Sequence, residues 1–187
     1  LMRAAMAELN DALRLLDDPV DMGVTAARII GEALGVDRVG YGLVDRAAET
    51  ITIERDWNAP GVRSLAGRLH LQAGRLEQAA PLLQAALAGG VQDRELLSSL
   101  LELWHRQGRR EEGRQALEAC LAFASGNADL WLARLALEDI GSSDALEVSR
   151  RWVEAQPQSV NALGGRLAAL EHAGRLDEAD AIADRIV

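Results

Sequence analysis

Three six-residue segments of this chain resemble one another, and they begin at Gly74, Gly108 and Gly174. The first two starting points are 34 residues apart and the last two are 66 apart, close to twice that interval. A period near 34 is typical of stacked helix–turn–helix units, which bury their apolar faces only against their neighbours. The spacing therefore predicts an array of helix pairs. Arrays of this kind usually bind other proteins.

Composition supports helices and limits the classes of partner. Hydrophobic residues make up 49% of the chain but aromatic residues only 3%, a balance that suits closely packed helices better than an all-β fold. The formal net charge of −9 argues against nucleic acid or an anionic membrane as the main partner. No segment approaches the roughly 20 apolar residues of a membrane span, and none resembles a secretory leader. We therefore expect a cytoplasmic protein.

The first 60 residues mix helical and strand-like patterns. The spacing of apolar residues predicts two helices and two strands, over residues 1–17, 19–34, 36–44 and 50–57. Pro19 suits the start of the second helix and Gly35 its end. A polar turn at residues 45–49 joins the strands into a hairpin. Two helices and one hairpin give only a thin core, so we expect this part to need another surface.

After residue 60 every apolar pattern is helical, and the helices fall into four pairs. We place them at 61–73 with 76–88, 92–106 with 110–123, 127–139 with 143–155, and 159–172 with 175–187. Gly74, Gly108 and Gly174 lie where the first helix of a pair ends, a position that favours a left-handed residue. Gly141 takes that position in the third pair, followed by Ser142 as a candidate N-cap. The predicted domains are thus residues 1–60 and residues 61–187.

The second of the helix pairs shows its pattern most clearly. Large residues recur at Leu97, Leu100 and Trp104, Gly108 occupies the turn, and the small Cys120 lies in the following helix. With this pattern residues 60–187 resemble the tetratricopeptide (TPR) repeat. The resemblance implies a mainly α fold: a right-handed α-solenoid of about four TPR-like helical hairpins, preceded by the small α+β segment.

Two residues depart from the TPR pattern. Gly113 stands where alanine is usual, at a cost of about 1 kcal/mol in a helix, and Leu101 stands where a small residue is usual. The third repeat is also shortened. Trp104 and Trp131 fall at large packing positions, so we expect both in the core, whereas Trp152 replaces a small residue and is harder to place.

Residues 33–42 (ALGVDRVGYG) and 51–57 (ITIERDW) form a second recognisable stretch. With residues 58–67 they resemble the opening of a GAF sensory domain, as found in bacterial sensor histidine kinases. The resemblance covers residues 8–67 and is incomplete, because a whole GAF domain is well over twice as long. It implies a role in signal transduction. It overlaps the TPR resemblance at residues 60–67. Natural recombination, an engineered fusion and an assembly artefact all stay open as origins of this join.

The sequence contains no recognisable catalytic constellation. His70, His105 and His172 fall in separate repeats, so we expect solvated or groove-lining histidines and no metal site. Cys120 is the single cysteine, which excludes an internal disulfide and a multi-cysteine zinc site and fits a reducing compartment. We expect its thiol to pack as a small hydrophobe. Serines lack a nucleophile-elbow context, and no dinucleotide fingerprint is present. We predict no enzyme activity, no catalytic residue and no cofactor.

In the TPR family the first helices of the pairs line a concave groove. The resemblance implies a partner-binding groove whose residues here are Arg68, Gln72, Glu102, His105, Arg106, Asp139, Glu171 and His172. Their mixed charges favour a peptide or partner helix of mixed character. The predicted function is a non-enzymatic protein–protein interaction scaffold.

Several alternatives stay open beside the scaffold. The chain could be a sensory input fragment of a histidine kinase, or a set of accessory repeats of a larger enzyme. The array could also act as a spacer or an oligomerisation surface. A homo-oligomer could form through the edge of the N-terminal hairpin, because unpaired strand edges associate readily, or through the terminal repeat. Neither nucleic acid nor a membrane is an expected partner.

Overall fold

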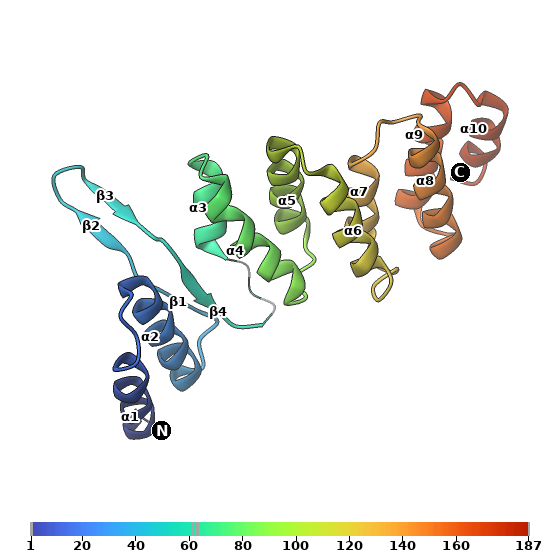
Figure 1. Cartoon of the computed structure of the whole chain (residues 1–187). Helices are drawn as coiled ribbons and strands as arrows, with labels where there is room; N and C mark the ends of the chain where they lie inside the picture. Colours follow the sequence, from blue (N-terminus) through green and yellow to red (C-terminus); the bar gives the residue numbers. More distant parts are fainter. Residues whose placement is uncertain (1, 61, 63, 187) are drawn as a thin grey trace. The chain divides into compact units, whose positions relative to one another are not determined.

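The computed structural model describes residues 2–60, 62 and 64–186 (Figure 1). The chain forms two compact units, Leu1–Val91 and Gln92–Val187. The first unit therefore contains the whole α+β segment together with the first predicted helix pair. A division into domains at residue 60 stays a prediction, while the compact units divide after Val91.

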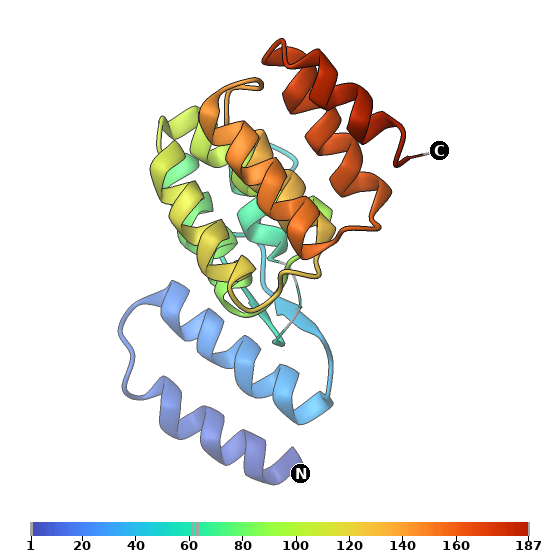
Figure 2. The same cartoon turned by 90° about the vertical axis from the view of Figure 1, so that its right-hand side faces the viewer.

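The first unit begins with two helices that lie side by side, α1 (Met2–Leu13) and α2 (Pro19–Leu34) (Figure 2). The Asp18 carboxylate caps α2 by accepting hydrogen bonds from the backbone N–H groups of Val20 and Asp21, at 2.8 and 3.0 Å. Gly35 ends α2 with a φ of 65°, the left-handed conformation that glycine adopts most readily. Local sequence signals thus set both ends of α2, as predicted.

The predicted hairpin is present, but it is interrupted. It consists of four short strands, β1 (Arg38–Gly40), β2 (Leu43–Asp45), β3 (Thr50–Thr52) and β4 (Asp56–Asn58). β1 pairs with β4 and β2 with β3, both antiparallel. Gly40 is opposite Asp56 and Leu43 is opposite Thr52. Two residues therefore separate β1 from β2, whereas three separate β3 from β4. An extra residue of this kind bends and twists a ribbon. Here it divides the hairpin into two short sheets.

Two glycines of α2 allow the hairpin to approach this helix closely. An ideal Cβ at Gly23 would lie 2.3 Å from the Tyr41 ring, and one at Gly31 would lie 2.1 Å from the Trp57 ring. Ala27, between them on the same face, is buried. The Trp57 ring packs on α2 because Gly31 leaves room for it.

The first helix pair completes the unit: α3 (Leu65–Gln72) packs against α4 (Leu76–Ala88). Gly74 lies between them with a φ of 75°, so the predicted left-handed turn is confirmed. Ala66, Leu71, Ala79 and Leu83 are buried in this pair. Small and aliphatic side chains thus form its core, as the composition predicted.

The second unit contains three helix pairs, whose positions agree with the predicted ranges to within a few residues. They are α5 (Arg94–Gln107) with α6 (Arg110–Leu121), α7 (Ala128–Ala136) with α8 (Ser143–Ala155), and α9 (Val160–His172) with α10 (Leu176–Ala183). Each helix packs against the next one, and α7 also packs against α5 and α9. The first helices therefore form one layer within this unit. A single right-handed array of all four pairs stays a prediction.

The turns of the second unit follow the predicted chemistry. Gly108, Gly141 and Gly174 all have positive φ values. Ser142 caps α8 by accepting the backbone N–H of Ala145 at 3.1 Å. No helix among those described has the length and hydropathy that a membrane span requires.

Large rings fill the core of the second unit. Trp104 and Trp131 are only 1% and 3% exposed, so their predicted place in the core is confirmed. An ideal Cβ at Gly113 would lie 2.7 Å from the Trp104 ring, which explains the glycine where the repeat pattern prefers alanine. Trp152 is accommodated in the same way by Gly165, at 2.8 Å, and it stacks on Trp131 with the ring centroids 6.5 Å apart.

These contacts predict opposite effects for two glycine-to-alanine substitutions in helices. Gly113→Ala places a Cβ against the buried Trp104 ring, and we expect it to lower the free energy of unfolding by about 1–3 kcal/mol. Gly164→Ala is the matched control, because an ideal Cβ at Gly164 has open space around it. It should raise the free energy of unfolding by about 0.5–1 kcal/mol through helix propensity. Urea denaturation of the full chain measures both, and two changes of the same sign would contradict the Trp104–Gly113 packing.

Candidate functional site

The structure places the predicted groove residues at exposed positions in both units. Arg68 and Gln72 lie on α3 in the first unit. In the second unit the others lie on α5, just after α7, and on α9: Glu102, His105, Arg106, Asp139, Glu171 and His172. Because α7 packs against both α5 and α9, these six belong to one layer of first helices. Six of the eight predicted residues therefore lie within one unit.

The surface of this layer in the second unit has mixed character. Arg106 forms an ion pair with Glu102 at 3.0 Å, and Arg110 reaches Asp139 at 3.4 Å. Leu132 and Ala136 are exposed on α7, and Gly164 leaves open space on α9. We call this surface, defined by the six predicted residues together with Leu132, Ala136 and Gly164, the first-helix surface. It offers apolar contact between compensated charges.

His70 does not belong to any such surface. The prediction of a solvated or groove-lining histidine was wrong at this position, because the side chain is only 1% exposed. Its Nδ1 accepts a hydrogen bond from the Arg75 guanidinium at 2.8 Å, and its Nε2 lies 2.8 Å from the backbone carbonyl of Glu54. Since arginine can only donate, Nε2 carries the proton and donates to that carbonyl. His70 thereby ties α3 to the hairpin.

Asp56 forms a second tie between the hairpin and α3. Its side chain is buried, and it accepts hydrogen bonds from the Ser64 hydroxyl at 2.7 Å and from the Leu65 backbone N–H at 2.8 Å. The Ser64 hydroxyl in turn accepts the N–H of Gly67 at 3.0 Å. A carboxylate at a helix N-terminus is favoured by the unpaired N–H groups there. Asp56 and Ser64 therefore cap α3 together and fix it to β4.

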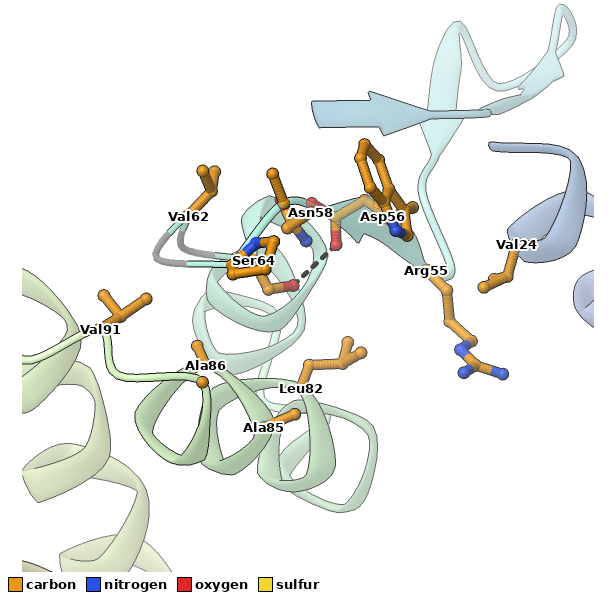
Figure 3. Close-up of a pocket in the computed structure, with 14 residues that line it drawn as sticks. Val24, Arg55, Asp56, Asn58, Val62, Ser64, Leu82, Ala85, Ala86 and Val91 are labelled. Atoms are coloured by element: carbon orange, nitrogen blue, oxygen red, sulfur yellow. Dashed lines mark hydrogen bonds between the residues drawn. The ribbon is translucent and has the colours of Figure 1, made fainter. Parts of the chain in front are cut away.

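A hollow of about 360 Å³ lies between β4 and α4 (Figure 3). We call it the β4–α4 hollow; its lining residues include Asn58, Val62, Leu82, Ala85, Ala86 and Val91. Most of the walls are apolar, and Figure 3 shows the Ser64–Asp56 hydrogen bond at its edge. Sequence reasoning missed this hollow because its residues come from three separate segments of the first unit, at residue 24, residues 55–64 and residues 82–91.

A ladder of ion pairs crosses α6, α7 and α8 in the second unit. Glu138, whose side chain is 2% exposed, contacts the guanidinium groups of both Arg114 and Arg134. Glu118 accepts hydrogen bonds from Arg134 at 2.9 Å and from Arg151 at 2.9 and 3.0 Å. A buried carboxylate needs partners of this kind to offset its loss of hydration. These ion pairs, which we call the ion-pair ladder, therefore link α6, α7 and α8.

The ladder continues into the aromatic core. The Arg151 guanidinium lies 5.6 Å from the centre of the Trp131 ring, a cation–π contact. The hydrogen bond from Arg151, followed by that from Arg134, lowers the pKa of Glu118 against the opposing effect of burial. Sequence reasoning missed these residues. The spacing of Arg134 and Glu138 within one helical turn was the available signal.

The described residues offer few groups suited to metal binding or nucleophilic catalysis. Among the described residues no group of three or more His, Cys, Asp and Glu side chains is placed to hold a metal ion. Cys120 is half-buried, and burial raises the pKa of its thiol. A raised pKa reduces the thiolate fraction and with it the reactivity of the cysteine.

Comparison with known proteins adds little to this geometry. No protein-family model matches the chain, and no curated protein matches it significantly. A solved structure of a mutant of MamA, a TPR-repeat protein, is 26% identical, covering 64% of this chain and 71% of that one, with a TM-score of 0.39. A structure of MamA AMB-1 is 25% identical, covering 64% and 67%, with a TM-score of 0.40. These TM-scores are too low to carry fold or function over. The GAF resemblance finds no support in the comparisons.

The ion-pair ladder predicts a pH-dependent loss of stability in Glu118→Gln. Because the folded chain holds the pKa of Glu118 below its ordinary value of 4.5, the ionised carboxylate stabilises the fold above that pH. This contribution declines as the pH falls through the lower folded pKa. We expect the variant to unfold at lower urea concentration than the wild type at neutral pH, with the difference shrinking in acid.

Urea titrations across a series of pH values measure this difference. Glu147→Gln on α8 is the matched control, because its ion pair with Arg150 is exposed and exposed pairs contribute little. A difference between wild type and Glu118→Gln that does not change with pH would contradict the role of the ladder.

Proposed function

We propose that this protein is a non-enzymatic interaction scaffold that binds a peptide or a partner helix on its first-helix surface. The observation that supports the proposal is the packing of α7 against both α5 and α9, which makes these three first helices neighbours in one layer. Such a layer offers a partner helix apolar contacts spaced along its length.

The chemistry of the surface favours a partner of mixed character. Two of its acids are offset by neighbouring arginines, in the Glu102–Arg106 and Asp139–Arg110 pairs. Leu132 and Ala136 lie exposed on the central helix of the layer. A partner that places an apolar side chain over α7 and charged groups over α5 and α9 satisfies all three helices. Arg68 and Gln72 on α3 are the proposed partner-binding residues of the first unit.

Peptides selected from a phage-displayed random library against the immobilised full chain supply a probe for this surface. We expect Ala136→Arg to weaken binding of a selected peptide by about tenfold or more, because the long charged side chain covers the centre of the surface. Fluorescence anisotropy of the labelled peptide measures the change in Kd.

Ala119→Arg is the matched control, since Ala119 is an exposed alanine on the second helix α6. It should leave the Kd unchanged. Equal effects of the two variants, or no effect of Ala136→Arg on any selected peptide, would rule out the first-helix surface.

We also propose self-association through the hairpin arm, β2 with β3. Leu43 and Val44 are each 64% exposed and Ile51 is 69% exposed. Among the described residues, β2 and β3 pair only with each other. A two-stranded ribbon is marginal by itself in water, and exposed edges pair readily with other strands. A second hairpin arm would cover these apolar side chains.

Sedimentation equilibrium tests this interface on the full chain. Ile51→Lys should shift the chain towards monomer at concentrations where the wild type self-associates, because a charge on the edge opposes strand pairing. Leu15→Lys is the control, as Leu15 is 85% exposed outside the hairpin. Loss of association in Leu176→Lys instead would assign the interface to the terminal repeat, and a monomeric wild type would remove the proposal altogether.

A sensory input role for the first unit is the second candidate function. The observation that favours it is the β4–α4 hollow, which is within the volume range of small-molecule sites. Residues from the hairpin and from α4 line it together, so a bound molecule would contact both. A sensory role requires that binding alters the exchange of backbone amides in α3 and α4 in the full chain, which hydrogen-exchange mass spectrometry measures.

A further inference from the structure

The polar side chains of the β4–α4 hollow leave hydrogen-bond donors facing its interior. Asn58 is the first of them. Its Oδ1 accepts a hydrogen bond from the Arg38 guanidinium at 2.8 Å. Because arginine has no acceptor, this contact fixes which end of the amide is oxygen. The NH2 group is then directed away from Arg38, and Figure 3 shows it pointing towards α4.

The acceptors around the hollow are already used. The Asp56 carboxylate receives hydrogen bonds from the Ser64 hydroxyl and the Leu65 backbone N–H, and the Arg38 guanidinium lies 3.5 Å from it. The Ser64 hydroxyl donates to Asp56 and accepts from Gly67. Both side chains already have hydrogen-bond partners, so neither requires a donor from a ligand. The hollow therefore selects for molecules that accept hydrogen bonds.

The charged residues that line the hollow also favour a ligand that accepts hydrogen bonds. Among the described residues that line the hollow, Arg55 and Asp56 carry charge, and the Asp56 carboxylate is buried against its own partners. Arg55 is about half exposed and pairs with Asp21 at 3.1 Å. An exposed pair of this kind contributes little, so exchanging Asp21 for an anion bound in the hollow would cost little. The accessible charge of the site is positive.

The remaining walls set the shape of the molecule that fits. Leu82, Ala85 and Ala86 of α4 form one side, with Val62 and Val91 towards one end (Figure 3). A volume of about 360 Å³ accommodates a small apolar molecule. Apolar surfaces on both sides would bury a tail, while the polar groups on β4 would meet a head group.

From these observations we propose that the β4–α4 hollow binds a small apolar monocarboxylate, with its carboxylate on Asn58 and Arg55 and its tail along α4. This assignment is independent of the first-helix surface and of the hairpin arm. It names the ligand class for the second candidate function. Binding alone tests the ligand, whereas amide exchange in α3 and α4 tests the sensory role, so the two can fail separately.

Isothermal titration of the full chain with octanoate tests the assignment. Octanol supplies the same tail without charge, and octylamine supplies it with the opposite charge. We expect octanoate to bind one to one, octanol to bind more weakly and octylamine not to bind. Failure of octanoate to bind, or octylamine binding as tightly as octanoate, would overturn the proposal.

Asn58→Asp separates the site from general affinity for fatty acids. It keeps the oxygen that accepts from Arg38 and replaces the amide NH2 by a second carboxylate oxygen, so we expect the fold to persist. Octanoate binding should weaken by at least about tenfold. Asn161→Asp, the same change at an exposed position on α9, should leave it unchanged.

Ala86→Trp provides a steric test of the same site, because it fills the space beside α4. We expect it to abolish octanoate binding while the circular dichroism spectrum stays that of the wild type. If Ala86→Trp changes that spectrum, Asn58→Asp decides. Unchanged octanoate affinity in Asn58→Asp, or in a folded Ala86→Trp, would overturn the assignment.

Discussion

Close contact between aromatic rings and helix glycines constrains how the hairpin packs on α2 in the first unit and how the helices pack in the second. Four of the six aromatic side chains lie against a glycine at a distance that leaves no room for a Cβ: Tyr41 on Gly23, Trp57 on Gly31, Trp104 on Gly113 and Trp152 on Gly165. In a chain whose core is mainly alanine and leucine, each large ring contributes a large contact area. Each ring fits only because its partner lacks a side chain, so ring and glycine constrain each other.

This constraint also marks the limit of what the sequence could predict. The ends of helices follow from neighbours along the chain, so Pro19, Ser142 and Gly108 could be assigned correctly from local signals alone. Gly113 could not. Compared with the repeat pattern it looks like a defect, because its partner Trp104 belongs to the other helix of the pair. The cost of glycine in a helix is offset by the ring that it admits.

The first unit shows the same limit at its polar contacts. His70 could be placed near the end of a helix, but its burial depends on the backbone carbonyl of Glu54, a group that every residue carries. Asp56 resembled one of the polar residues of an alternating strand, and it instead caps α3 with Ser64. These contacts attach the first helix pair to the hairpin, which is why the compact units divide after Val91.

The candidate surfaces differ in the same respect. Six positions of the first-helix surface could be named from the sequence, because a repeat places equivalent positions on equivalent helices. The six residues of the second unit are exposed there as expected. The β4–α4 hollow has no such period, and its walls come from segments brought together by the ties at Asp56 and His70. A site of this kind depends on tertiary contacts between distant segments, so it could not be predicted from the sequence.

Within the first unit, the short strand β4 connects the hollow with α3. Asp56 at one end of the strand caps α3, and Asn58 at the other end faces the hollow, while Arg38 contacts both side chains. A molecule that binds β4 and α4 together, and not the unfolded chain, stabilises this arrangement by an amount that rises with the logarithm of its concentration above the Kd. Arg68 and Gln72, two of the predicted partner-binding residues, lie on the helix that Asp56 caps. If a partner on α3 favours the same arrangement, thermodynamic linkage requires each ligand to raise the affinity for the other by the same factor.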